Sequence, residues 1–162
     1  MSSTIQKILV ALDHSEISDL VFEEVLTLAS ALNAKLMLVH VVSAEESISP
    51  RMMPTGSILG GYSEIASVSF ERFREEWQAY IDRGIEMLQS RAKQAADLGV
   101  EAEYQQLSGG TGIQICEAAK TADADLIAIG RRGYSGFKEF IMGSVSNYVL
   151  HHAPCSVMVI HK

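Results

Sequence analysis

Cysteine is scarce in this chain, and long apolar runs do not occur in it. The two cysteines among 162 residues, Cys116 and Cys155, match neither a disulfide framework nor a metal-ligand motif. Both lie in apolar patterns, so we expect buried thiols. No run approaches the roughly 20 apolar residues of a membrane-spanning helix, and residues 1–7 do not resemble a signal peptide. We therefore expect a cytoplasmic protein that does not enter a membrane.

Basic residues are outnumbered by acidic ones. Thirteen Lys and Arg stand against 20 Asp and Glu, which gives a formal net charge of −7. A surface with this charge repels polyanions, so a nucleic-acid partner or an anionic membrane partner is not expected. The chain has the hydrophobic content of an ordinary globular protein, and its length suits one domain with a substantial core. We expect a single domain over residues 1–162.

Two spacings of apolar residues alternate along the chain. Short β-branched and aliphatic runs predict strands at 8–12, 36–42, 100–104, 126–129 and 155–160. Between them, apolar residues recur every three or four positions, which predicts helices at 17–32, 70–92, 113–122 and 143–152. Strands that alternate with helices indicate an α/β fold, with a mostly parallel sheet covered by helices on both faces.

The stretch from residue 43 to about residue 66 has neither spacing. It contains two prolines and three glycines, and it leaves the carboxyl end of the second predicted strand. Ligands bind at that edge in open α/β folds. A loop of this length is either functional or a flexible part of the surface. A lid over a ligand and a mobile surface loop are both consistent with the sequence.

Residues 125–146 predict a phosphate site. An apolar strand ends at Gly130, a glycine-containing loop follows, and a helix begins near Gly143 and Ser144. Glycines let backbone N–H groups approach a ligand, and the start of a helix favours an anion. Ser144 and Ser146 add hydroxyl groups. Positive charge gathers in the same stretch, from Arg131, Arg132 and Lys138. The alternative is an ordinary turn from strand to helix, with Ser144 as the N-cap.

Two common nucleotide motifs are absent. The chain has no G-x-x-x-x-G-K-[ST] run, and no G-x-G-x-x-G run follows the first strand. Asp13 ends that strand, where its carboxylate can accept from ribose hydroxyls or hold Mg²⁺ through water. The alternative is that Asp13 caps the next helix together with Ser15. We expect His14 to be an exposed turn histidine and His40 a core histidine, and no metal-ligand spacing is present.

The combination Gly130-x2-Gly133-x9-Gly143-Ser144 resembles the G-x2-G-x9-G-[ST] signature of the ATP-binding universal stress proteins. The run 7–15 and the run from residue 143 to residue 160 are similar to that family as well, so the resemblance covers nearly the whole chain outside 43–66. It implies an open five-stranded parallel sheet, Rossmann-like and adenine nucleotide alpha hydrolase-like, that binds ATP at its carboxyl edge.

The resemblance also implies roles for single residues. Asp13 would meet the ribose or a bound Mg²⁺, and Val41 would lie against the adenine. The remaining nucleotide-binding positions would be Ala11, Gly130, Arg131, Gly133, Gly143, Ser144, Val145 and Ser146. Gly130 and Gly133 would pass beside the ribose and phosphates, while Gly143, Ser144 and Ser146 would hold the phosphates. Many ATP-binding members have proline at the position of Ala11.

Three functions are compatible with this reading. The chain could be a binding module in which ATP regulates a stress response, a slow ATPase or autophosphorylating enzyme, or a dimeric scaffold without nucleotide. In the enzyme alternative, Ser144 or Ser146 would accept the phosphate. Nothing in the sequence resembles a phosphoryl-transfer site with a dedicated base and paired metal ligands, which favours the binding module and names no catalytic residue.

The last predicted strand, Cys155 to Ile160, is apolar on both faces. We expect it at an edge of the sheet, where an uncovered apolar strand pairs readily with another chain. The sequence therefore predicts a symmetric homodimer formed by pairing of this strand, and the family resemblance implies the same.

Overall fold

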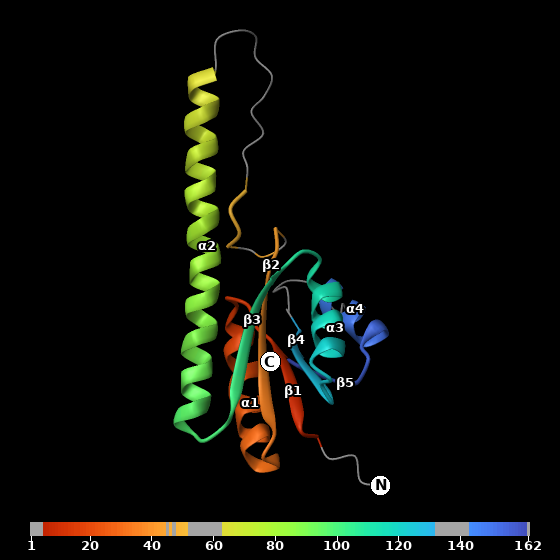
Figure 1. Cartoon of the computed structure of the whole chain (residues 1–162). Helices are drawn as coiled ribbons and strands as arrows, with labels where there is room; N and C mark the ends of the chain where they lie inside the picture. The colour runs from red at the N-terminus through yellow and green to blue at the C-terminus, as the bar shows by residue number, and fades with distance from the viewer. Residues whose placement is uncertain (1–4, 45, 47, 52–62, 132–142, 162) are drawn as a thin grey trace.

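The structure is a computed structural model that describes residues 5–44, 46, 48–51, 63–131 and 143–161, with the backbone alone for 63–67 (Figure 1). Strands and helices alternate along these residues. Their order is β1 (Lys7–Ala11), α1 (Glu16–Leu32), β2 (Lys35–Val42), α2 (Ser63–Asp97), β3 (Ala102–Ser108), α3 (Thr111–Thr121), β4 (Leu126–Gly130), α4 (Ser144–His152) and β5 (Ser156–Ile160).

The strands form one sheet in the order β3-β2-β1-β4-β5, and every neighbouring pair is parallel. In the centre, Ile8 of β1 lies opposite Leu36 of β2 on one side and Leu126 of β4 on the other. This confirms the α/β fold with an open five-stranded parallel sheet. Within the described residues, no helix is long and apolar enough to cross a membrane.

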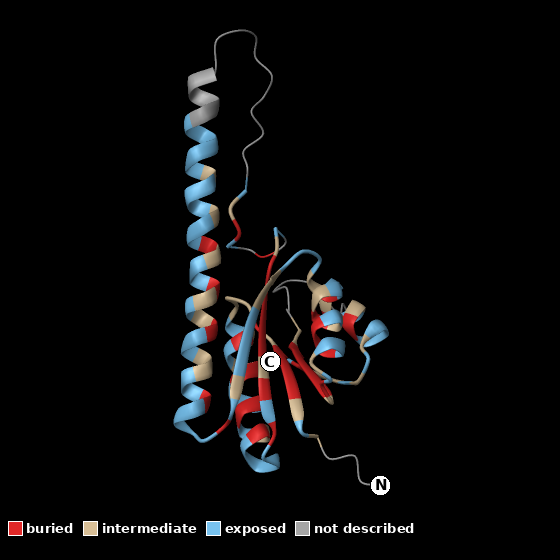
Figure 2. Cartoon of the chain, in the orientation of Figure 1, coloured by how far each residue is buried: buried red, intermediate tan, exposed pale blue. Residues whose placement is uncertain are grey.

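The sheet separates two hydrophobic clusters. Ile8 and Val10 point to the face covered by α1 and α2, where they pack with Phe22 and Leu88. Leu9 points to the other face, which α3 and α4 cover. Because both faces are covered, the three middle residues of β1, Ile8, Leu9 and Val10, are fully buried and form a continuous apolar run (Figure 2). β3 is largely exposed at its edge, as the alternating polar residues predict.

Helix α2 is longer than the apolar spacing predicts. It begins at Ser63 instead of near residue 70, so the stretch expected to be a loop at 43–66 ends earlier. The added part extends beyond the sheet in Figure 1. Val68 within it is exposed, as is Phe70 just after it, so neither marks a buried stripe that apolar spacing could reveal. Residues 45, 47 and 52–62 of that stretch lie outside the described residues.

Cys116 and Cys155 are half-buried, not buried as we expected. Cys116 lies at the margin of the cluster on α3, and Cys155 comes just before β5, which is an edge strand of the sheet that the described residues form. Burial nevertheless raises the pKa of both thiols.

Gly84 lets α2 approach the sheet closely. A Cβ atom at this position would lie 2.5 Å from His40 Nδ1 and 2.2 Å from Gln106 Nε2. A larger residue would therefore displace the side chains of His40 and Gln106. The close contact brings Tyr80, one turn earlier on α2, to the carboxyl end of β2. Gly99 follows α2 with φ of +75°, as expected for the residue that ends a helix.

Candidate functional site

A pocket of about 310 Å³ opens at the carboxyl edge of the sheet. This volume lies in the range of ligand pockets, roughly 300–1,000 Å³. The lining residues come from the ends of β1, β2 and β4, the segment after β2, and the starts of α1, α3 and α4. They are Ala11, Leu12, Asp13, Ile17, Ser18, Val39, Val41, Ser43, Glu46, Thr111, Ile115, Ile129, Gly130, Gly143, Ser144, Val145 and Ser146.

The structure brings most of the predicted site residues together. Ala11, Asp13, Val41, Gly130, Gly143, Ser144, Val145 and Ser146 all line the pocket. Arg131 follows Gly130 but is not among the lining residues, and its main-chain N–H donates to the carbonyl of Ile160 on β5. Gly133, Arg132 and Lys138 lie outside the described residues.

The start of α4 forms the wall beside β4. Gly143 occupies the N-cap position, so Ser144 is the first helical residue and not the cap that we considered. Among the described residues, no side chain caps this helix, and none of them accepts from its first N–H groups in place of a cap. The hydroxyl of Ser146 donates to the Gly143 carbonyl at 3.0 Å. An uncapped helix start in a pocket wall is suited to an anion, because the helix dipole adds positive potential there.

Asp13 is held in the turn between β1 and α1. Its Oδ1 accepts hydrogen bonds from the main-chain N–H of Ser15, at 2.8 Å, and from the Ser15 hydroxyl. Its own N–H donates to the Ser18 hydroxyl at 2.9 Å. Ser15 is the N-cap of α1 by position, but its side chain makes no capping bond to the helix. Ser15 therefore does not cap α1 through its side chain, as the alternative considered above required, because its hydroxyl binds the Asp13 carboxylate instead.

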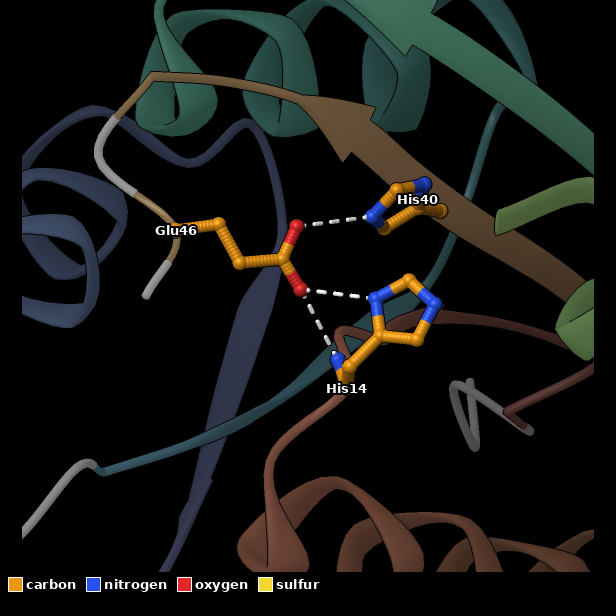
Figure 3. A group of neighbouring side chains, drawn as sticks. All are labelled: His14, His40 and Glu46. Atoms are coloured by element: carbon orange, nitrogen blue, oxygen red, sulfur yellow. Dashed lines mark hydrogen bonds and ion pairs between the residues drawn. The ribbon is translucent and has the colours of Figure 1, made fainter. Parts of the chain in front are cut away.

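Glu46 is a buried carboxylate that sequence reasoning missed. It follows β2, is 5% exposed and lines the same pocket. Its carboxylate points toward His14 and His40 (Figure 3). Its Oε1 accepts from the main-chain N–H and from Nδ1 of His14, both at 2.9 Å. Its Oε2 accepts from Nε2 of His40 at 3.1 Å and from the hydroxyl of Tyr80. One carboxylate thereby joins the turn after β1, the strand β2 and the helix α2.

Two expectations change at this cluster. The His14 side chain is only 19% exposed and is bonded to Glu46, so it is not an exposed turn histidine. His40 is fully buried, which confirms a core histidine. Ligand atoms of His14, His40 and Glu46 lie within 4.8 Å of one another, so metal-ligand residues do gather here despite their unremarkable spacing in sequence. The one signal in the sequence is His40, a polar residue in an apolar strand, which requires a buried partner.

The cluster changes the acidity of its members. Burial alone would raise the pKa of Glu46, but hydrogen bonds from His14, His40 and Tyr80 hold it well below its usual range. The hydrogen bond to Glu46 raises the pKa of His14, against the opposite effect of burial. Burial and the bond to Glu46 raise the pKa of Tyr80. At neutral pH Glu46 is therefore ionised and Tyr80 keeps its proton.

The model of the universal stress protein family matches residues 4–161. Universal stress protein Sll1388 of Synechocystis sp. is 36% identical over 157 residues, which cover 95% of this chain and 96% of that protein. Universal stress protein YxiE of Bacillus subtilis is 31% identical over 154 residues, which cover 95% and 97%.

Solved structures of similar proteins share the fold. Universal stress protein UspA from Lactobacillus plantarum matches with a TM-score of 0.71 at 23% identity, over 98% of this chain and 99% of that one. A universal stress protein in complex with cAMP matches with a TM-score of 0.62 at 21% identity, over 98% of both chains. The family protein At3g01520 from Arabidopsis thaliana, with AMP bound, matches with a TM-score of 0.59 at 22% identity, over 97% of this chain and 92% of that one.

Replacing Glu46 by Gln tests how much the charge contributes to stability. A carboxyl with a lowered pKa stabilises the fold above its ordinary value of 4.5 and loses this effect in acid. A histidine with a raised pKa stabilises below its ordinary value of 6.5 and loses the effect as the pH rises through the folded pKa. The Glu46→Gln variant should therefore lose the most stability between these values, about 3 kcal/mol near pH 6, as measured by urea unfolding.

The control is Glu16→Gln, which removes one exposed charge from the first turn of α1 and should cost less than about 1 kcal/mol. The difference in the free energy of unfolding between wild type and Glu46→Gln should be smaller near pH 3 and near pH 9 than near pH 6. A difference of the same size at all three pH values would show that the shape of Glu46 matters and its charge does not.

Proposed function

This chain belongs to the universal stress protein family, and we propose that it is a cytoplasmic binding module whose occupancy by ATP regulates a stress response. The observation that carries the proposal is the pocket in which Asp13, Val41 and Gly130 face the uncapped start of α4. Such a pocket offers an apolar surface, a carboxylate and an anion site in one cavity, which are the groups that a nucleotide needs.

Each part of an adenine nucleotide has a matching wall. Val39, Val41 and Ile129 offer apolar surface for the base. The carboxylate of Asp13 can accept from ribose hydroxyls, and it would hold Mg²⁺ through a water molecule, since oxygen ligands suit this ion. The N–H groups at the start of α4 would receive the phosphates. The structures of relatives with AMP and with cAMP support adenine nucleotides as the ligand class. The preference for ATP rests on the glycine signature of residues 130–144.

Two substitutions of Gly143 test the phosphate site. An added Cβ would meet Ser146 Oγ at 3.5 Å, which is an ordinary contact, so this position accepts a side chain. Asp and Asn are equally good N-caps and almost equal in size. The Gly143→Asp variant should nevertheless bind ATP·Mg at least about tenfold more weakly than Gly143→Asn, because one charged contact is worth this much.

Calorimetric titration of nucleotide-free protein measures the difference between these two variants. Equal affinities for Gly143→Asp and Gly143→Asn would place the phosphates away from α4. No binding of ATP, AMP or cAMP to folded wild-type protein would leave the scaffold as the better interpretation.

Two features of the site support a binding module over an enzyme. The Ser146 hydroxyl is buried and already donates to the Gly143 carbonyl, which makes it a poor phosphate acceptor. Glu46 has a lowered pKa, and a carboxylate with a lowered pKa is a weak general base. We expect no added phosphate in the intact mass after incubation with ATP·Mg. A gain of one phosphate that disappears in Ser144→Ala would instead establish autophosphorylation.

The homodimer is the second part of the proposal. Strand β5 is the last in the sheet order, and no other described strand pairs with its outer edge. Its middle residues, Val157, Met158 and Val159, are half-buried in the single chain. Pairing of residues 155–160 with their symmetry mates would satisfy this edge and cover apolar surface. Sedimentation velocity should show a dimer, whereas a monomer at every concentration would contradict the pairing.

A further inference from the structure

The Glu46 carboxylate already has its full set of hydrogen bonds. An ionised carboxylate has about four acceptor sites, and here His14 fills two, His40 one and Tyr80 one. Glu46 lines the pocket, but it has no acceptor site left for a ribose hydroxyl. The four hydrogen-bond donors that surround its negative charge all belong to the protein itself. Asp13, not Glu46, is therefore the carboxylate that can serve a ligand directly.

A metal ion is the first alternative for this cluster, since three ligand atoms gather in it. The surroundings of His40 argue against it. Gln106 Nε2 donates to the carbonyl of Ile81 at 3.0 Å, and the same nitrogen lies 3.0 Å from His40 Nδ1. His40 Nδ1 must therefore accept, and the proton of the ring is on Nε2, where it points at Glu46. A metal at Nε2 would need this proton to move to Nδ1, against an amide donor.

The bonds of Glu46 control the turn that carries Asp13. Two of the four donors belong to His14, the residue directly after Asp13. They are its main-chain N–H and its ring nitrogen Nδ1 (Figure 3). The other two come from His40 on β2 and Tyr80 on α2, both fully buried. Glu46 thus holds the turn against rigid parts of the fold, while Ser15 orients the Asp13 carboxylate from within the turn.

We propose that Glu46 is a positioning residue for nucleotide binding: it fixes the Asp13 turn as a pocket wall before the ligand arrives. The role rests on the proposed function, because the ligand concerned is the adenine nucleotide. A pocket wall that is ordered before the ligand binds lowers the conformational entropy that is lost on binding. Removing the carboxylate would leave His14 and His40 donors unpaired in the wall and release the turn.

The test is calorimetric titration with ATP·Mg at about pH 7. The terminal phosphate is ionised there, since its second pKa is about 6. Near pH 7, Glu46→Gln should bind about tenfold more weakly than wild type, which corresponds to one charged hydrogen bond. Glu16→Gln removes the same charge from an exposed site near the pocket, and its affinity for ATP·Mg should stay within about twofold of the wild-type affinity.

A core variant separates positioning from general damage to the fold. Leu88→Ala removes buried apolar contacts away from the pocket, so it should lower the free energy of unfolding and leave the affinity within about twofold of wild type. His14→Gln should weaken binding about tenfold, like Glu46→Gln. If Glu46→Gln does not fold, His14→Gln decides alone. An affinity of Glu46→Gln or His14→Gln equal to that of Glu16→Gln, or the same loss of affinity in Leu88→Ala, would overturn the role of Glu46. Wild-type protein that binds no adenine nucleotide would overturn the proposed function together with this role.

Discussion

The parallel direction of all five strands is the constraint on which the site depends. Because each connection crosses the sheet through a helix, the carboxyl ends of β1, β2 and β4 meet at one edge. The turn with Asp13, the segment with Glu46 and the start of α4 converge there from distant parts of the chain. Two hydrophobic clusters, one on each face, fix the strands so that these ends keep their places.

The net charge of the protein has the same sign as the charge of the proposed ligand. The chain carries a net charge of −7, yet the proposed ligand is an anion. Two arrangements reconcile these facts. The start of α4 presents backbone N–H groups whose positive potential is local and does not depend on the total charge. The buried Glu46 carboxylate is surrounded by donors from His14, His40 and Tyr80, which turn its charge away from the ligand. The pocket can therefore hold two carboxylates and still receive phosphates.

The fold could be predicted from the sequence because buried parallel strands and amphipathic helices leave strong periodic signals. The meeting of Gly130 with residues 143–146 at one pocket could be predicted from the glycines and serines there, which lie close together in the chain. The Glu46 cluster could not, because His14, His40, Glu46 and Tyr80 meet only through the tertiary fold and their spacing has no period. The true start of α2 could not be predicted for a related reason, since an exposed residue such as Val68 marks no buried apolar stripe.

The assignment of the carboxyl-edge pocket as the nucleotide site is the central claim, and amide chemical-shift mapping during titration with AMP tests it most directly. The account predicts shifts at Asp13, Gly130 and 143–146, with Asn33 and Gly99 at the opposite edge of the sheet unchanged. Shifts confined to the opposite edge, or to the exposed face of β3, would place the ligand elsewhere and contradict the account.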